Sequence, residues 1–267
     1  MEYQKFIPEG WNNEKRKLTR NELEEAYQEE KILQGYVTKC DSQYNLYIAC
    51  LDGTVGIMPR TEVEAINIDE HGLPKPNLCV NKVDKLVQFK VKGIDSQEQY
   101  ILSRKNVSQE ALKWAIYELE PGMIVNGIVK SIQAYGVFVE IGGGIVGLLH
   151  IEDISVVRIK NPTERFEIGQ KIKVMIKSID KEQERVILTY KELLGSWEDN
   201  VNSFHEGDIV TGIVREADKS KSGIFIELKP NLVGMAEYRD NIEYGQDVIV
   251  NIKRIIPEKK KIKLVIL

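Results

Sequence analysis

The chain has 267 residues, of which 42% are hydrophobic and 29% are charged, and its net charge is −4. This composition is typical of a folded globular protein, and the length predicts two or three small domains. The apolar stretches are far shorter than the roughly 20 residues that span a bilayer, so we expect no membrane association. An isoelectric point of 5.7 argues against the basic surface typical of a duplex-DNA clamp.

The cysteine and histidine residues predict neither a disulfide scaffold nor a metal site. Cys40, Cys50 and Cys79 are odd in number and form no Cys-x-x-Cys motif, so we expect reduced thiols in a cytoplasmic protein. The N-terminal residues lack the apolar core of a signal peptide. The three histidines lack the spacing of metal ligands and fall in different segments, so we expect no metal and no cofactor.

Residues 1–30 are predicted to form an N-terminal helical segment with a net charge of −3. Thr19 and Glu22 have the spacing of a capping box, in which each side chain satisfies a backbone N–H at the start of a helix. We therefore expect a helix that begins after Thr19 and extends towards Glu30.

Three similar segments follow, and they begin near Gly35, Gly127 and Gly212, which lie 92 and 85 residues apart. Self-similarity at a nearly fixed period indicates copies of one structural unit. Each copy is long enough to form its own core. The predicted domains, each with a net charge of +1, are 31–105, 121–192 and 206–267, and the connectors between them, each with a charge of −2, are 106–120 and 193–205.

The middle copy contains five short segments rich in Val and Ile, with a longer connection between the third and the fourth. From Lys171 to Lys177, polar and apolar residues alternate, which predicts a strand with one buried face. Five such strands are typical of a small Greek-key barrel. The predicted fold is therefore mainly β, with three five-stranded barrels of the OB type joined by short helical connectors.

Both connectors are predicted to be helical. In the first, Ser108 is a candidate N-cap, and Leu112, Ala115 and Ile116 would share one face. The second is predicted to run from Glu192 to Phe204. We expect these helices to pack against the neighbouring barrels.

Tyr135 and Phe138 are candidates for an exposed aromatic pair. Residues three apart on a regular strand point to opposite faces, but a bulge or bend at Gly136 would bring both rings to the surface. The alternative is that Phe138 belongs to the core and Tyr135 to a loop. The first copy has Tyr44 and Tyr47 in the same register, and exposed rings are favoured there because each hydroxyl needs a partner.

The order of motifs in these copies resembles the S1 RNA-binding domain. Gly-x-Val at Gly127, the segment Tyr135–Ile141, Gly-Leu-Leu-His ending at His150, and Ile-Asp followed by Arg-x-x-Leu-Thr carry the resemblance. It covers about 31–267 and is most specific in the middle copy. In that copy it implies a single-stranded RNA-binding face formed by Lys130, Tyr135, Phe138, His150, Asp180 and Arg185.

These residue types suit the implied role. Aromatic rings can stack on bases, Arg185 can contact phosphate or a base, and His150 can donate to phosphate or sugar. Asp180 is expected to orient Arg185 or His150 rather than to contact the polyanion.

The other copies depart from this pattern. The first keeps Asp95 but has Pro59 at the histidine position, and its arginine position falls near Gln99 and Tyr100. The third keeps Phe225, with Ser222, Glu237, Pro257 and Lys261 at the remaining positions. We therefore expect the middle copy to dominate binding. The lysine run 259–261 is interpreted as a hairpin tip, with contact to phosphate as the alternative.

Catalysis is not predicted. Gly142 to Gly147 matches the G-x-G-x-x-G pattern of dinucleotide sites, but a strand rather than a helix follows, so a hairpin turn is favoured. We predict a monomeric, non-enzymatic RNA-binding protein that acts in translation, with the small ribosomal subunit as a candidate partner. Two alternatives remain open: a protein–protein adaptor, and an accessory subunit of an RNA-processing or RNA-decay assembly.

Overall fold

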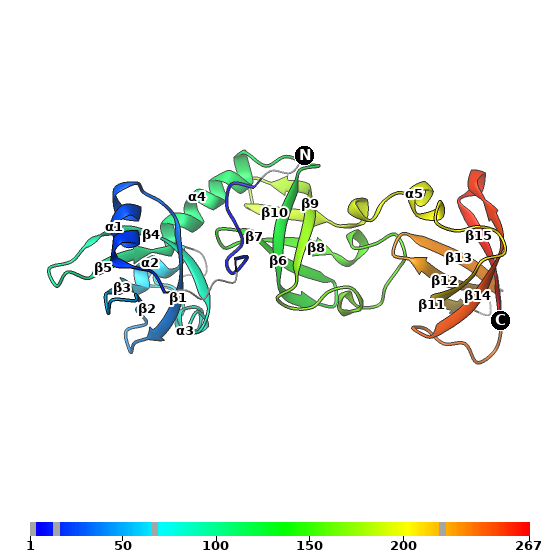
Figure 1. Cartoon of the computed structure of the whole chain (residues 1–267), viewed down its shortest axis with the longest axis horizontal. Helices are drawn as coiled ribbons and strands as arrows, with labels where there is room; N and C mark the ends of the chain where they lie inside the picture. Colours follow the sequence, from blue (N-terminus) through cyan, green and yellow to red (C-terminus); the bar gives the residue numbers. More distant parts are fainter. Residues whose placement is uncertain (1–3, 13–16, 66–68, 219–222) are drawn as a thin grey trace.

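The computed structural model describes residues 4–12, 17–65, 69–218 and 223–267. Three closed barrels follow one another along the longest axis of the molecule (Figure 1). Each barrel has five strands, and short helices lie between the barrels. The predicted fold class is thus confirmed. None of the described helices is long and apolar enough to span a membrane, and all three cysteines are free thiols.

The strands repeat one topology, in which the first strand pairs with the second and the fourth, and the third pairs in parallel with the fifth. The first barrel contains β1 (Leu33–Cys40), β2 (Leu46–Ala49), β3 (Val55–Met58), β4 (Leu86–Ile94) and β5 (Tyr100–Ser103). The second contains β6 (Ile124–Gln133), β7 (Gly136–Gly142), β8 (Ile145–His150), β9 (Lys171–Asp180) and β10 (Arg185–Thr189). The third contains β11 (Ile209–Asp218), β12 (Gly223–Lys229), β13 (Leu232–Glu237), β14 (Asp247–Ile256) and β15 (Lys261–Ile266).

Side chains point alternately inward and outward along each strand, and the inward ones form the barrel cores. In β9, Ile172, Val174 and Ile176 are buried, while Lys171, Lys173 and Lys177 are exposed, as the sequence predicts. The predicted long connection between the third and fourth strands is also present. It holds helices α2 (Arg60–Val63) and α3 (Pro76–Val80) in the first barrel, and the 3-10 turns η1 (Ile151–Asp153) and η2 (Pro162–Glu164) in the second.

A β-bulge recurs in the first strand of every barrel. The pairing register skips Thr38 in β1, Lys130 in β6 and Arg215 in β11. A bulge leaves one residue unpaired and turns its side chain away from the regular alternation. The second and third barrels use this residue to contact the preceding part of the chain.

Helix α1 (Arg20–Gln28) has the predicted capping box between Thr19 and Glu22. Residues 4–12 contain no helix and form an arm between the first two barrels (Figure 1). Helix α4 (Arg104–Tyr117) is capped at its N-terminus by Ser103, whose side chain accepts the amide of Asn106. The predicted cap, Ser108, is wrong because its buried hydroxyl bonds to the carbonyl of Arg104 inside the helix.

Helix α4 is buried on more sides than the sequence predicts, because it lies between two barrels. Its Trp114 is fully buried, and the ring of Phe6 from the arm lies 5.6 Å away. The second connector helix, predicted from Glu192 to Phe204, is interrupted. Gly195, with φ of 80°, separates the 3-10 turn η3 (Lys191–Leu194) from α5 (Trp197–Val201). Only a residue that tolerates a positive φ fits there.

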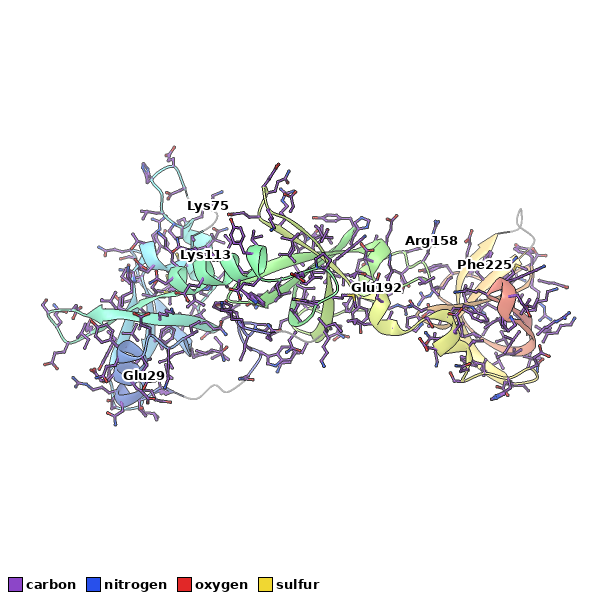
Figure 2. The ribbon with its side chains drawn as sticks, turned by 90° about the horizontal axis from the view of Figure 1, so that it is seen from above. Glu29, Lys75, Lys113, Arg158, Glu192 and Phe225 are labelled. Carbon is purple, nitrogen blue, oxygen red and sulfur yellow. The ribbon has the colours of Figure 1, made fainter. Side chains whose placement is uncertain are left out.

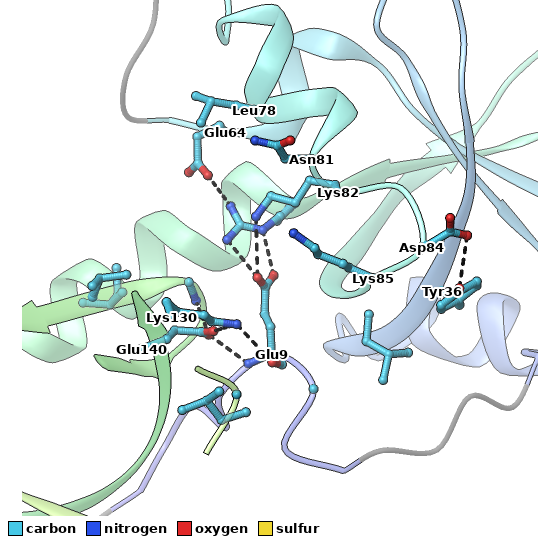
Figure 3. Close-up of a pocket in the computed structure, with 18 of the residues that line it drawn as sticks. Glu9, Tyr36, Glu64, Leu78, Asn81, Lys82, Asp84, Lys85, Lys130 and Glu140 are labelled. Carbon is cyan, nitrogen blue, oxygen red and sulfur yellow. Dashed lines mark hydrogen bonds and ion pairs between the residues drawn. The ribbon is translucent and has the colours of Figure 1, made fainter. Parts of the chain in front are cut away.

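Buried ion pairs join the first two barrels (Figure 3). The Glu9 carboxylate accepts from Nε of Arg104 at 2.7 Å and from Nη2 at 3.0 Å. Nη1 of Arg104 donates to Glu64 at 2.6 Å. The arm, helix α4 and the first barrel therefore meet at one guanidinium.

The second barrel joins the same network through Glu140, which is 1% exposed. Its Oε1 accepts the backbone N–H of Glu9 at 2.8 Å, and its Oε2 lies 2.6 Å from Nζ of Lys130. A cavity of about 690 Å³ opens beside these groups, between the two barrels (Figure 3). We call this network the first joint.

The second joint, between the second and third barrels, repeats the arrangement. The buried Glu227 accepts from Nε of Arg215 at 2.5 Å and from Arg165 of the second barrel at 2.5 Å. Arg215 also bonds to Glu164 of the second barrel. By strand register Glu227 stands where Glu140 stands in the second barrel, and Arg215 stands where Lys130 stands. Asn231 adds hydrogen bonds to the carbonyls of Lys191 and Gly195 and to the amide of Val156.

The first joint should depend on the charge of Glu9. Burial favours the neutral acid, but the charges of Arg104 and Lys82 outweigh it and lower the pKa of Glu9 from 4.5 to about 2. Because the folded pKa lies below the unfolded value, ionised Glu9 stabilises the fold above pH 4.5. This stabilisation is lost as the pH falls towards 2.

We expect Glu9→Gln to lower the free energy of unfolding of the joined barrels by about 3–5 kcal/mol at pH 7, because it leaves Arg104 buried without a full partner. The difference from wild type should shrink as the pH falls below 4.5. Urea titrations at several pH values measure both effects. Glu118→Gln, which removes an exposed pair with Lys5 of the same arm, is the control and should cost less than about 1 kcal/mol. A pH-independent effect of Glu9→Gln would contradict the assignment.

Candidate nucleic-acid interface

Tyr135 and Phe138 lie next to each other on the surface of the second barrel. Their ring centroids are 6.1 Å apart and the rings are nearly perpendicular, at 88°. Tyr135 is 51% exposed and Phe138 is half-buried outside the core cluster. The edge-to-face arrangement is a favourable one for aromatic pairs. The alternative is therefore wrong for Phe138, which lies outside the core cluster, and right for Tyr135, which lies in a turn.

The reason for this geometry differs from the predicted one. Gln133 pairs with Gly136, so Tyr135 lies in the two-residue turn between β6 and β7 and not on a strand. The bulge lies at Lys130, across the hairpin, rather than at Gly136. Since a turn residue does not follow strand alternation, the ring of Tyr135 can reach the face that carries Phe138.

Gly136 lets two strands approach closely at this point. It pairs with His150, the last residue of β8, and the carbonyl of Tyr135 accepts the amide of Ile151 at 2.9 Å. A Cβ at position 136 would lie 2.6 Å from the carbonyl oxygen of Leu149 and 3.1 Å from Cα of His150. The absent side chain therefore brings His150 beside the aromatic pair.

His150 has one ring nitrogen engaged within the protein. Its Nδ1 accepts the amide of Glu152 at 3.4 Å, which caps the 3-10 turn η1. With Nδ1 as the acceptor, Nε2 carries the proton in the neutral ring. The half-exposed imidazole can thus donate a hydrogen bond from Nε2 to an external oxygen.

Apolar side chains continue the face across the sheet. Phe138 pairs with Leu148 and Leu148 pairs with Ile187, so these three side chains form a row on the outer surface. Leu148 and Ile187 are both partly exposed. Neither residue was predicted as part of the face, although their outward positions in alternating strands were a usable signal.

Arg185 and Asp180 lie at the opposite end of the same face. Arg185 precedes Ile187 by two residues, while His150 follows Leu148 by two, so Arg185 and His150 are roughly 14 Å apart along the sheet by strand geometry. Arg185 and Asp180 are exposed cross-strand partners. The Asp180 carboxylate accepts the amides of Glu182 and Gln183 and so shapes the turn before Arg185. These hydrogen bonds hold Asp180 in its own turn and do not orient Arg185 or His150, which is the role that the sequence predicts for it.

Lys130 lies apart from this group. Its ammonium is held by Glu140 and the carbonyl of Glu9 at the first joint. The structure thus gathers Tyr135, Phe138 and His150 at one end of the face and Arg185 with Asp180 at the other, and places Lys130 between barrels.

The first barrel presents a smaller version of the face. Tyr47 pairs with Ile57 as Phe138 pairs with Leu148, so Pro59 does stand at the histidine position. The Tyr47 hydroxyl donates to Asp41 at 2.9 Å. Tyr44 packs partly against the core below the guanidinium of Arg60, 5.1 Å from its ring centroid. Both rings are half-buried, so the first barrel offers less aromatic surface than predicted.

In the third barrel, Phe225 pairs with Met235, which places Glu237 at the histidine position as predicted. Lys261 occupies the arginine position, but its cross-strand partner is Ile256. The predicted equivalence of Pro257 with Asp180 is therefore displaced by one residue. Ser222 lies outside the described residues. Within the described ranges, no group of three His, Cys, Asp or Glu side chains could hold a metal ion.

Comparison with known proteins points to the second barrel. Residues 118–191, which include strands β6 to β10, match the family described as S1 RNA binding domain. Over 195 residues the chain is 33% identical to small ribosomal subunit protein bS1 of Staphylococcus aureus (strain COL), a match that covers 67% of this chain and 49% of that protein. The chain therefore spans about half the length of these curated relatives.

Two further similarities involve other proteins. The chain is 30% identical over 260 residues to 4-hydroxy-3-methylbut-2-enyl diphosphate reductase of Clostridium acetobutylicum, which covers 91% of this chain but only 39% of that protein. The solution structure of GSP13 from Bacillus subtilis is 27% identical, covers 29% of this chain and 60% of its own, and has a TM-score of 0.28. The reductase activity belongs to a protein of which this chain spans well under half.

We expect Gly136→Ala to disturb the interface locally. The added methyl group would collide with backbone atoms of β8, and such overpacking costs about 1–3 kcal/mol. Thermal unfolding should show a lower melting temperature, and the Ile151 amide should exchange faster with solvent. Gly93→Ala is the matched control, because a Cβ there meets no atom within 4 Å. Unchanged exchange at Ile151 in Gly136→Ala would show that the close approach is not required.

Proposed function

This chain belongs to the S1 RNA-binding domain family, and from that premise we propose that it binds single-stranded RNA mainly through the outer face of the second barrel. The observation that supports this proposal is the edge-to-face pair of the exposed Tyr135 and the half-buried Phe138, beside His150. Aromatic surfaces of this kind bind unpaired bases by stacking.

Each part of the face has a separate role in the proposal. Tyr135 and Phe138 provide stacking surfaces, and the aliphatic side chains of Leu148 and Ile187 continue the apolar floor beside them. Nε2 of His150 donates to a phosphate or sugar oxygen, and the guanidinium of Arg185 contacts phosphate at the far end. Since stacking and phosphate contacts carry little base information, binding should tolerate many sequences.

The proposed role is binding without catalysis, in translation. Its support is the similarity to small ribosomal subunit protein bS1, a relative whose name places it in the small subunit. We propose that this chain acts as a cytoplasmic monomer on messenger RNA and associates with the small ribosomal subunit.

We expect Tyr135→Ala combined with Phe138→Ala to weaken binding of a labelled single-stranded RNA. Alanine substitution of a stacking residue costs about 1–3 kcal/mol per base, so the dissociation constant should rise by about 10-fold or more. Fluorescence anisotropy titration measures the change. Tyr27→Ala removes a comparably exposed ring from α1 and should leave affinity unchanged. Equal affinity of the double variant and Tyr27→Ala would remove the second barrel as the main site.

The role in translation has a separate test. After sucrose-gradient sedimentation of a cell extract, the chain should migrate with small subunits, and nuclease treatment that removes messenger RNA should reduce this association. Co-migration in a manner independent of RNA would favour a protein–protein adaptor instead. Absence from every ribosomal fraction would contradict the proposed role while leaving RNA binding intact.

A further inference from the structure

The outer row of the third barrel carries cations where the other barrels carry apolar or small residues. Phe225 pairs with Met235, Met235 with Lys263, and Lys263 with Arg254, so these four side chains cross the surface in one row. Met235, Lys263 and Arg254 are exposed, and Phe225, which is labelled in Figure 2, is half-buried. Lys261 points to the same side, two residues before Lys263.

The corresponding rows of the other barrels differ at the last two positions. The second barrel has Phe138, Leu148, Ile187 and Ser178. The first barrel has Tyr47, Ile57, Ile101 and Gly93. The third barrel thus keeps an aromatic ring, Phe225, followed by an apolar side chain, Met235. At the last two positions, Lys263 and Arg254 replace the apolar or small residues of the other two rows.

The hairpin that carries this row is strongly basic. Residues 253–263 include six basic side chains and one acidic one, whereas the corresponding residues 177–187 of the second barrel include three of each. Lys260 pairs with Glu198. In the described part of the chain no ion pair involves the other five cations of this hairpin, which are Lys253, Arg254, Lys259, Lys261 and Lys263.

Two acidic side chains of this face, Glu216 and Glu237, lie away from the cations, whereas the carboxylate of Glu206 accepts the amide of Ile255, next to Arg254 in the chain. Glu216 pairs with Phe225, and Glu237 pairs with Gly223, so both lie at the β11–β13 end of the row. Lys263 and Arg254 lie at the β14–β15 end. The face therefore has a cationic half that is not neutralised by the acidic half.

We propose that this cationic row is a second nucleic-acid contact, which holds the phosphodiester backbone of the RNA strand by charge. The inference rests on the proposed function of the second barrel, because it assigns a further segment of the same ligand to the third. Unpaired Lys and Arg side chains bind phosphate and release its counterions on contact. Phe225 and Met235 beside them provide an apolar surface on which a base can stack. A purely anionic protein segment or a lipid headgroup has no base to place there.

The test is the salt dependence of RNA binding by the full chain. The triple variant Arg254→Gln, Lys261→Gln, Lys263→Gln should bind a long single-stranded RNA more weakly across different sequences. Its slope of log affinity against log salt should be less steep by about 2, since each contact with a single strand contributes about 0.7. Between 50 and 200 mM salt, wild-type affinity should therefore fall about 20-fold more than that of the variant.

Two control variants test whether the salt dependence comes from the position of these cations or only from the total charge of the chain. Lys75→Gln, Lys113→Gln, Arg239→Gln removes the same charge from other exposed sites and should keep the wild-type slope. Lys261→Arg with Lys263→Arg keeps the cations and should also keep it. Circular dichroism of each variant reports whether the barrels are folded.

The outcomes distinguish this inference from the proposed function. If the row variant keeps the slope of the control while Tyr135→Ala with Phe138→Ala weakens binding, the third-barrel contact is refuted and the second-barrel site stands. If the row variant alone weakens binding, the third-barrel contact stands and the second-barrel site fails. Unchanged RNA binding together with lost binding to phosphatidylserine-containing vesicles would overturn the nucleic-acid contact in favour of a lipid surface.

Discussion

The architecture depends on placing a carboxylate inside each barrel junction. Glu140 and Glu227 occupy the same position in consecutive barrels, and both are almost fully buried. A buried charge is costly unless it is paired and hydrogen-bonded. Burial and the nearby Glu9 raise the pKa of Glu140, as expected for a carboxylate removed from water. One of its partners, the backbone N–H of Glu9, comes from the arm, so moving the arm away would remove that hydrogen bond, whereas the ion pair with Lys130 lies within the second barrel.

The cation of each joint is supplied by the bulge of the first strand. Lys130 and Arg215 are the unpaired residues of β6 and β11; Lys130 contacts the carbonyl of Glu9 in the arm, and Arg215 contacts Glu164 of the second barrel. The first barrel has Thr38 at this position. These two basic side chains therefore contribute to the joints between barrels. The outer faces of the barrels are formed by other residues.

The three outer faces share one framework and differ in chemistry. The same cross-strand pairing presents Tyr47 in the first barrel, Phe138 in the second and Phe225 in the third. The second barrel adds another ring and an imidazole, and the third adds cations. Stacking and charge are thereby distributed over different barrels of one chain, which suits a ligand that is an extended polymer with both bases and phosphates.

The alternating Val and Ile segments and the turn residues determined the repeat, its five strands and the identity of the candidate rings, because these depend on contacts between residues close in sequence. Pairing between distant segments decided the rest. Tyr135 reaches Phe138 through a turn, the bulge lies at Lys130, and Ser103 rather than Ser108 caps α4. The separation of Lys130 from Tyr135, and the alignment of Phe225 with Lys263 and Arg254, follow from barrel register. A single sequence does not contain that register, since it is fixed only when the strands close around a core.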